Sequence, residues 1–197
     1  KLVMRLIPDK KEGEGDPAEP VYLDDRLMAQ PAAALQLAAK EILHLAFLVG
    51  EQLHLTTGMV RRKEEGRPAA GIEQRERLKG LGGKITEYLS GLFSAGVLTE
   101  EQAAQTAGVM YLLGDVERMG ELCVDVTLAI EDRDRRKTKY SKEAMKDLEK
   151  SLKVIEDMYG AALQVLTTGD EESARKIRKK KEKVLDLDIE MRKGHMD

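Results

Sequence analysis

The stretch that decides the fold prediction runs Tyr111-Leu-Leu-Gly-Asp115-Val-Glu117-Arg118-Met119-Gly120-Glu121-Leu-Cys-Val-Asp125. It lies inside a run that contains no proline from Thr99 to beyond Arg136. Apolar residues recur in this run at alternating spacings of three and four residues: Val109, Leu112, Val116, Met119, Cys123, Val126 and Ile130. This spacing predicts one continuous apolar face on a long helix.

Four acidic residues of the same stretch, Asp115, Glu117, Glu121 and Asp125, fall outside this apolar face. The last three are each four residues apart, so their carboxylates should lie along one stripe of the helix. Such a stripe supplies oxygen ligands for a multivalent cation such as iron, manganese, magnesium or calcium. It is equally typical of a solvated helix face on which Arg118 makes local ion pairs. Both interpretations stay open at this point.

The composition favours a helical bundle. The 197 residues are 35% charged and 4% aromatic, and they include no tryptophan. A net charge of −3 argues against a general nucleic-acid binder, so no nucleic-acid partner is expected. The single cysteine, Cys123, excludes an internal disulfide and a cysteine-based zinc site, and its place on the apolar face predicts a small buried side chain. With no run of about 18 apolar residues, we predict no transmembrane segment.

The chain begins with Lys-Leu-Val-Met-Arg rather than an initiator methionine, so we expect it to be part of a longer protein. A stretch rich in glycine, proline and charge, Asp9–Asp25, should be unable to bury enough apolar surface to order itself. We therefore predict a linker there, within a first segment covering residues 1–30.

Five helices are predicted after this segment, at Pro31 to about Glu65, Ile72–Ser94, Thr99–Arg136, from Ser141, and from Glu171 to the end of the chain. The stretch Gly66-Arg-Pro68-Ala-Ala-Gly71 is expected to end the first helix. Because the connections are short, successive helices should be antiparallel. The predicted fold is all-α: a three-helix bundle over residues 31–137, followed at 138–197 by a second repeat that lacks its third helix.

The apolar residues of each helix predict its packing face. The first helix has Leu35, Ala38, Ile42, Leu45, Val49 and Leu53, and the second has Leu78, Leu81, Ile85, Tyr88 and Leu92. The fourth has Met145, Leu148, Leu152, Ile155, Tyr159, Ala162 and Leu166. The fifth is poor in apolar residues and is expected to pack through Ile177, Val184, Leu185 and Met191. Gly80, Gly82 and Gly83 weaken the second helix, so we expect a close helix approach or a kink there.

Two further patterns resemble metal or nucleotide sites. Glu41-x-x-His44 and Glu51-x-x-His54 match the pair that di-iron bundles use, but both lie on one helix, about 15 Å apart along its axis. We therefore interpret His44 and His54 as ordinary polar positions. The segment Gly80–Thr86 resembles a phosphate-binding loop but lacks the required first glycine and a preceding strand, so we reject it.

Basic residues gather in three clusters, at Arg61–Lys63, Arg133–Lys139 and Arg175–Lys183. Cations near the ends of helices can simply complement the helix dipole. The alternative is a basic surface that faces phosphate, lipid headgroups or an acidic partner. Packing explains the run at residues 179–181 least well.

The block Asp115-Val-Glu117-Arg118-Met119-Gly120-Glu121-x-x-x-Asp125 resembles the D-x-E-R-I-G-D signature of the PhoU family. Glu121-x-x-x-Asp125 is similar to that family's (E/D)-x-x-x-D metal motif, with glutamate where aspartate is usual. Residues 21–27, followed by Pro31 and an alanine- and leucine-rich helix, resemble the entry to the PhoU-like domain of bacterial Na⁺/phosphate cotransporters. The similarity covers about residues 20–197, and its specific part is the block Asp115–Asp125.

This resemblance implies two three-helix bundles in tandem, each with an acidic motif on its third helix that binds iron or another multivalent cation. It implies regulation of phosphate uptake rather than catalysis, on the cytoplasmic side of the bacterial inner membrane. The membrane part of the same transporter would be the partner, and residues 1–8 would be the exit from its last membrane helix. This chain ends before a second acidic motif, so the uncovered helices of the second repeat could be covered by another copy in a homo-oligomer.

Two other functions stay open. A freestanding PhoU-type adaptor would act on a phosphate transporter and a sensor kinase through protein contacts. A di-iron carboxylate enzyme would need a second Glu-x-x-His helix, which the sequence does not provide.

Overall fold

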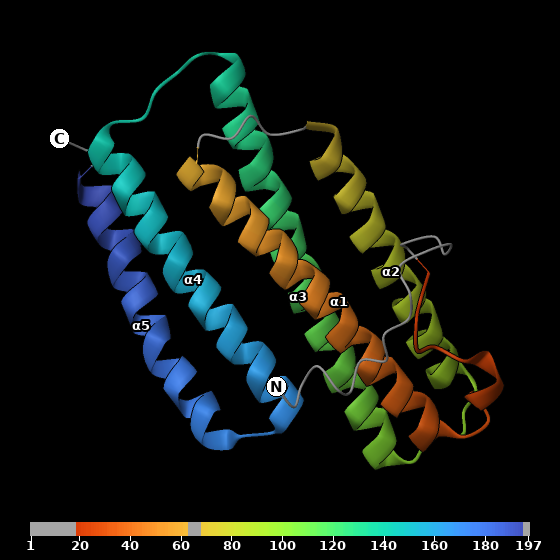
Figure 1. Ribbon diagram of the computed structural model, residues 1–197. Helices are drawn as coiled ribbons and strands as arrows, with labels where there is room; N and C mark the ends of the chain where they lie inside the picture. The colour runs from red at the N-terminus through yellow and green to blue at the C-terminus, as the bar shows by residue number, and fades with distance from the viewer. Residues whose placement is uncertain (1–18, 63–67, 195–197) are drawn as a thin grey trace.

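The computed structural model describes residues 19–62 and 68–194, and within these ranges it is all-α, as predicted. The helices are α1 (Pro31–Arg62), α2 (Pro68–Ser94), α3 (Glu100–Arg135), α4 (Lys142–Thr168) and α5 (Glu171–Gly194), with a 3₁₀ turn, η2 (Asp25–Leu27), before α1. Successive helices run antiparallel (Figure 1), and α4 packs on α1 rather than on its predecessor α3. The predicted membrane exit at residues 1–8 lies outside the described residues.

Helix α1 is the centre of the molecule, since α2, α3 and α4 all pack against it. Helix α5 lies on the outer side of α4 and forms one edge of the bundle (Figure 1). By length and composition alone, Pro31–Val60 of α1 could cross a membrane, and just under half of its most apolar window is buried in the bundle. Core helices of soluble proteins pass the same test. The predicted absence of a membrane span therefore stays a prediction.

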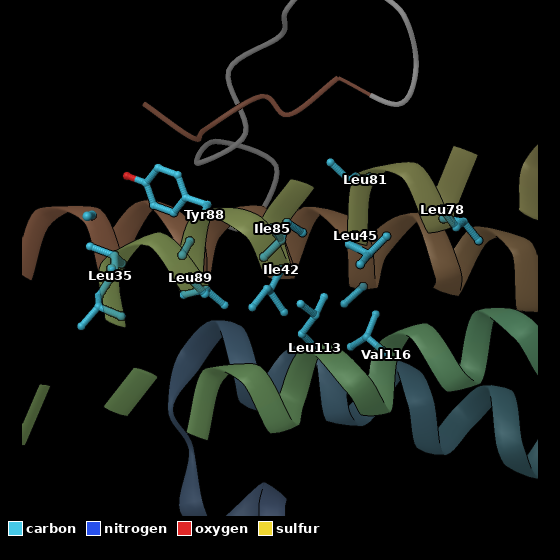
Figure 2. Packing of buried hydrophobic residues seen from close by; sticks show 14 of the residues in the cluster. Leu35, Ile42, Leu45, Leu78, Leu81, Ile85, Tyr88, Leu89, Leu113 and Val116 are labelled. Carbon is cyan, nitrogen blue, oxygen red and sulfur yellow. The ribbon is translucent and has the colours of Figure 1, made fainter. Parts of the chain in front are cut away.

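The main core lies between α1, α2 and α3 (Figure 2). All apolar residues predicted to face inward on α1 and α2 are buried, which confirms both helix faces. Gly120 of α3 packs against Leu78 and Val49, where an added Cβ would come within 3.3 Å of each side chain. This close approach brings α3 against α1 and α2 together.

Helix α3 is buried along a wider face than its apolar spacing predicts. Val116, Cys123 and Ile130 are buried as expected, and the other buried residues are Thr106, Leu113, Gly120, Val124 and Thr127. The face is wide because two helices pack on α3, and the hydroxyls of Thr56 on α1 and Thr127 on α3 lie 3.2 Å apart within the interface. Burial raises the pKa of the Cys123 thiol to about 11. Cys123 is thus the small buried side chain that was predicted.

The helix boundaries largely follow the capping signals. Thr99 forms the predicted capping box with Gln102 at the start of α3, Ser141 caps α4, and Gly169 ends α4 with φ of 69°. The start of α2 was predicted wrongly, because Pro68 opens this helix instead of helping to end the previous one. Proline is well suited to the first turn, where its missing N–H has no helical partner.

The second repeat is more exposed than its apolar pattern suggests. On α4 only Leu152 of the predicted face is buried, and Leu166 is 45% exposed. On α5 the buried residue is Leu187, which was not predicted, whereas Leu185 was expected to pack and is 54% exposed. Both differences arise because α4 packs between α1 and α5, while α5 packs mainly against α4. The remaining faces of this hairpin have little cover from the other described helices.

Candidate cation site

A pocket of about 540 Å³ opens between α1, α2 and α3 beside the acidic block. Leu45 and Val49 of α1 and Leu78 of α2 supply its apolar wall. Its polar lining residues are Arg75, Lys79, Glu117, Glu121 and Asp125. The three carboxylates with four-residue spacing therefore share one pocket, as the predicted stripe requires. The fourth predicted residue, Asp115, is exposed and does not line it.

Glu117 is the most enclosed of the four carboxylates, because its side chain lies over Gly82 of α2. A Cβ placed on Gly82 would come within 2.0 Å of Glu117 Oε1, so the glycine makes the room that this side chain occupies. Burial raises the pKa of Glu117 above its ordinary value, and the nearby charge of Glu121 adds to the rise. The expected close helix approach among the glycines of α2 is thus confirmed at Gly82.

The other two carboxylates of the pocket already have cationic partners. Arg75 Nη2 of α2 lies 2.8 Å from Asp125 Oδ1, and Arg118 Nη1 lies 3.0 Å from Glu121 Oε2. The Nε atom of Arg75 is buried and has no hydrogen-bond partner among the described residues. The local ion pair predicted for Arg118 is therefore present, and a second pair from α2 joins it.

In this arrangement the carboxylates do not converge on a single point. Among residues 19–62 and 68–194, no three side chains of histidine, cysteine, aspartate or glutamate form a group that could hold a metal ion. A cation could bind the three carboxylates together only if Arg75 and Arg118 moved away. Metal binding by Asp115, Glu117, Glu121 and Asp125 stays a prediction.

The two histidines of the Glu-x-x-His patterns are held by different partners. His44 Nδ1 lies 2.8 Å from Glu41 Oε1 on the same helix. His54 Nδ1 lies 2.5 Å from Glu156 Oε1 of α4 and joins α4 to α1. The two patterns face different neighbours, which agrees with their interpretation as ordinary polar positions.

Glu41 was not recognised as important from the sequence, yet its carboxylate is completely buried. It accepts hydrogen bonds from the backbone N–H groups of Tyr22 and Val21 as well as the contact from His44. Burial alone would raise the pKa of Glu41, but these hydrogen bonds outweigh it and lower the pKa below its ordinary value. The charged form is therefore the one that the fold stabilises.

This carboxylate fastens a segment, residues 19–30, that we call the strap. Tyr88 of α2 donates a hydrogen bond to the Asp24 carbonyl at 3.1 Å, and Lys84 pairs with Glu19 at 2.6 Å. Leu23 and Met28 pack against the main core. The linker prediction was therefore wrong for residues 19–25, because hydrogen bonds with α1 and α2 and the packing of Leu23 on the core order this segment. Residues 9–18 of the predicted linker lie outside the described part.

The basic clusters differ in how far acidic partners neutralise them. Arg135 and Arg136, at the end of α3, both pair with Asp132, at 2.9 and 2.7 Å. This cluster matches the simple interpretation of cations at a helix end. The side chains of the cluster at Arg61–Lys63 lie outside the described part.

Comparison of the chain with family models, curated proteins and solved structures finds no match in any of the three.

Proposed function

We propose that this chain is a PhoU-like regulatory domain of a bacterial Na⁺/phosphate cotransporter. In this proposal it acts at the cytoplasmic side of the inner membrane and has no catalytic role. It controls phosphate uptake through contacts with the membrane part of the same transporter, and a multivalent cation at the pocket biases those contacts.

The observation that carries the proposal is the placement of the acidic block. Glu117, Glu121 and Asp125 lie on the third helix of an antiparallel three-helix unit and line one pocket with α2. The antiparallel α4–α5 hairpin follows this unit. This order agrees with the tandem arrangement that the resemblance of the Asp115–Asp125 block implies.

The chemistry of the donors fits a hard cation, since all three are carboxylates. Two of these carboxylates are already paired with arginines, and a cation can bind them only by displacing those arginines. A cation has to displace Arg75 from Asp125 and Arg118 from Glu121, both of which are surface ion pairs of low stability. Glu117 binds the cation only as the carboxylate, so binding should weaken as the pH falls through its raised pKa.

Equilibrium binding of Mn²⁺ and of Fe³⁺ tests the cation part of the proposal. We expect the double variant Glu121→Ala/Asp125→Ala to lose the site. The matched control is Glu143→Ala/Asp147→Ala on α4, which removes the same residue types at the same spacing away from the pocket and should bind normally. Equal stoichiometry in the two double variants would remove the acidic block from the site.

Phosphate uptake by cells tests the regulatory part independently. Deleting the coding segment for residues 19–197 from the intact gene should change how uptake responds to external phosphate. The Glu121→Ala/Asp125→Ala variant should reproduce part of that change, whereas Glu143→Ala/Asp147→Ala should not. An unchanged response after the deletion would contradict the proposal, whatever the metal measurements show.

A further inference from the structure

The first half of α5 carries a high density of positive charge. Residues 175–183 contain seven lysines and arginines and a single glutamate. Many of these cations are three or four residues apart, so they are neighbours on the helix surface and repel one another. A helix gains nothing in stability from such a run, which therefore requires another explanation.

Several of these cations have no acidic partner within the described part of the chain. Lys176 pairs with Glu172 at 2.9 Å. Four others are exposed and make no ion pair with any residue in the described part of the chain: Arg178, Lys180, Lys181 and Lys183. They thus differ from Arg135 and Arg136 at the end of α3, which both pair with Asp132. Their charge is available to an external anion.

Two large aliphatic side chains continue the same stripe. Arg178, Lys181, Leu185 and Ile189 are spaced by three, four and four residues, so they follow one another up one side of α5. Leu185 is 54% exposed and Ile189 is 49% exposed. The packing side of α5, which includes Leu187 and Met191, faces α4 instead. We call the four-residue stripe the outer face of α5.

This face is open to a large flat partner. Helix α5 forms the edge of the bundle, and its first turns lie at the same end of the molecule as η2, opposite the α3–α4 turn (Figure 1). The nearby acidic residues in its second half are partly neutralised, since Asp188 pairs with Arg192 at 2.9 Å and Glu190 lies 4.0 Å from Lys150 Nζ. Asp186 is exposed and makes no ion pair in the described part of the chain, so the unneutralised positive charge is concentrated toward the start of the helix.

We propose that the outer face of α5 binds the surface of a membrane that contains anionic phospholipids. Arg178 and Lys181 contact the headgroups, and Leu185 and Ile189 enter the boundary between headgroups and acyl chains. The combination of cations with exposed aliphatic side chains favours an anionic membrane over a nucleic acid as the partner. Exposed aliphatic side chains gain free energy in a lipid boundary, whereas a nucleic-acid surface offers them nothing and is usually read by aromatic and hydrogen-bonding groups.

Co-sedimentation of the full chain with vesicles tests this inference. We expect binding to vesicles that contain phosphatidylglycerol, weaker binding to pure phosphatidylcholine, and loss of binding as salt is added. Each cation near an anionic surface is worth about fivefold in partitioning, so Arg178→Gln/Lys181→Gln should reduce it roughly 25-fold. The control Lys139→Gln/Lys146→Gln removes two exposed cations from the α3–α4 region and should bind as the wild type does.

The aliphatic pair is tested separately with Leu185→Ala/Ile189→Ala, which keeps every charge. We expect weaker vesicle binding and an unchanged circular dichroism spectrum, since both side chains lie outside the core. Equal binding to both kinds of vesicle, or equal loss in the control variant, would overturn the inference. So would tighter binding to single-stranded DNA than to vesicles with no effect of the aliphatic substitutions, because that result would assign the face to nucleic acid.

Discussion

A completely buried carboxylate is costly unless the protein supplies hydrogen bonds to it. Glu41 has such bonds from His44 and from the backbone of Val21 and Tyr22. Two of these donors belong to the strap, so the ionised side chain and the order of the strap depend on each other. Glu41 is therefore the residue on which the attachment of the strap depends.

Replacing Glu41 with glutamine should lower the free energy of unfolding by about 1–3 kcal/mol, because a charged acceptor is lost and an amide donor then faces backbone N–H groups. Urea denaturation at neutral pH measures this loss. Glu51→Gln, on an exposed part of the same helix, should change stability little. Equal effects of the two substitutions would show that the buried hydrogen bonds do not hold the strap.

The pH dependence has a definite sign. Because folding lowers the pKa of Glu41, its stabilising contribution is present above the ordinary pKa of glutamate and is lost as the pH falls through the lowered value. The difference in stability between wild type and Glu41→Gln should therefore shrink in acid.

The burial of Glu41 could be predicted from the sequence, but its hydrogen-bond partners could not. It lies three residues after Ala38 and four before Leu45, so it occupies the buried face of α1 as a charged residue among apolar ones. Its backbone partners could not be predicted, because N–H groups of a segment rich in turns leave no signature in the sequence. The same holds for the pocket. The spacing along α3 predicts that Glu117, Glu121 and Asp125 lie together, whereas the pairing of Arg75 with Asp125 depends on how α2 packs and could not be predicted.

At the scale of the helices, the sequence predicted a helix start reliably where the stabilising hydrogen bonds join residues that are close in the sequence. The Thr99 hydroxyl accepts from the Gln102 N–H at 3.2 Å, and the Gln102 side chain accepts from the Thr99 N–H at 3.0 Å. This reciprocal pair satisfies two backbone donors that α3 would otherwise leave without partners. The start of α3 was therefore predictable, whereas Pro68 could equally end one helix or begin the next.

Thr99→Ala should cost about 0.5–2 kcal/mol, since it removes the acceptor at the start of the longest helix. Thermal unfolding should show a midpoint lower by about 2–4 °C for each kcal/mol. Thr99→Ser keeps the hydroxyl and should remain close to the wild type. If serine and alanine destabilised equally, the methyl group rather than the cap would be the important part of Thr99.

Apolar spacing predicted which helices are amphipathic but not how many neighbours each one has. On α1, where three helices pack, every residue of the predicted face is buried. On α4 the same kind of spacing leaves most of the face partly exposed, and on α5 it selected Leu185 instead of Leu187. The number of helices that cover a given helix depends on how the whole bundle is arranged. It therefore cannot be predicted from the sequence of that helix alone.

For the whole molecule, the arrangement predicts a gradient of local stability from α1 to α5. Local opening is easiest where little apolar surface is buried, and α5 buries Leu187 alone among its large apolar side chains. Amide hydrogen exchange should therefore be fastest in α5, intermediate in α4 and slowest in the middle of α1. Protection of α5 equal to that of α1 would show that another surface covers α5 in solution.

The central position of α1 also matters while the protein is being made. During synthesis its 32 residues leave the ribosome before α2, α3 and α4 exist to cover them. Until the chain has been extended through α2 and α3, a helix apolar enough to cross a membrane lacks the helices that cover it in the folded bundle. The nascent chain should then depend on a chaperone or on rapid pairing with α2, and its risk of aggregation or misdirected insertion is highest in that interval.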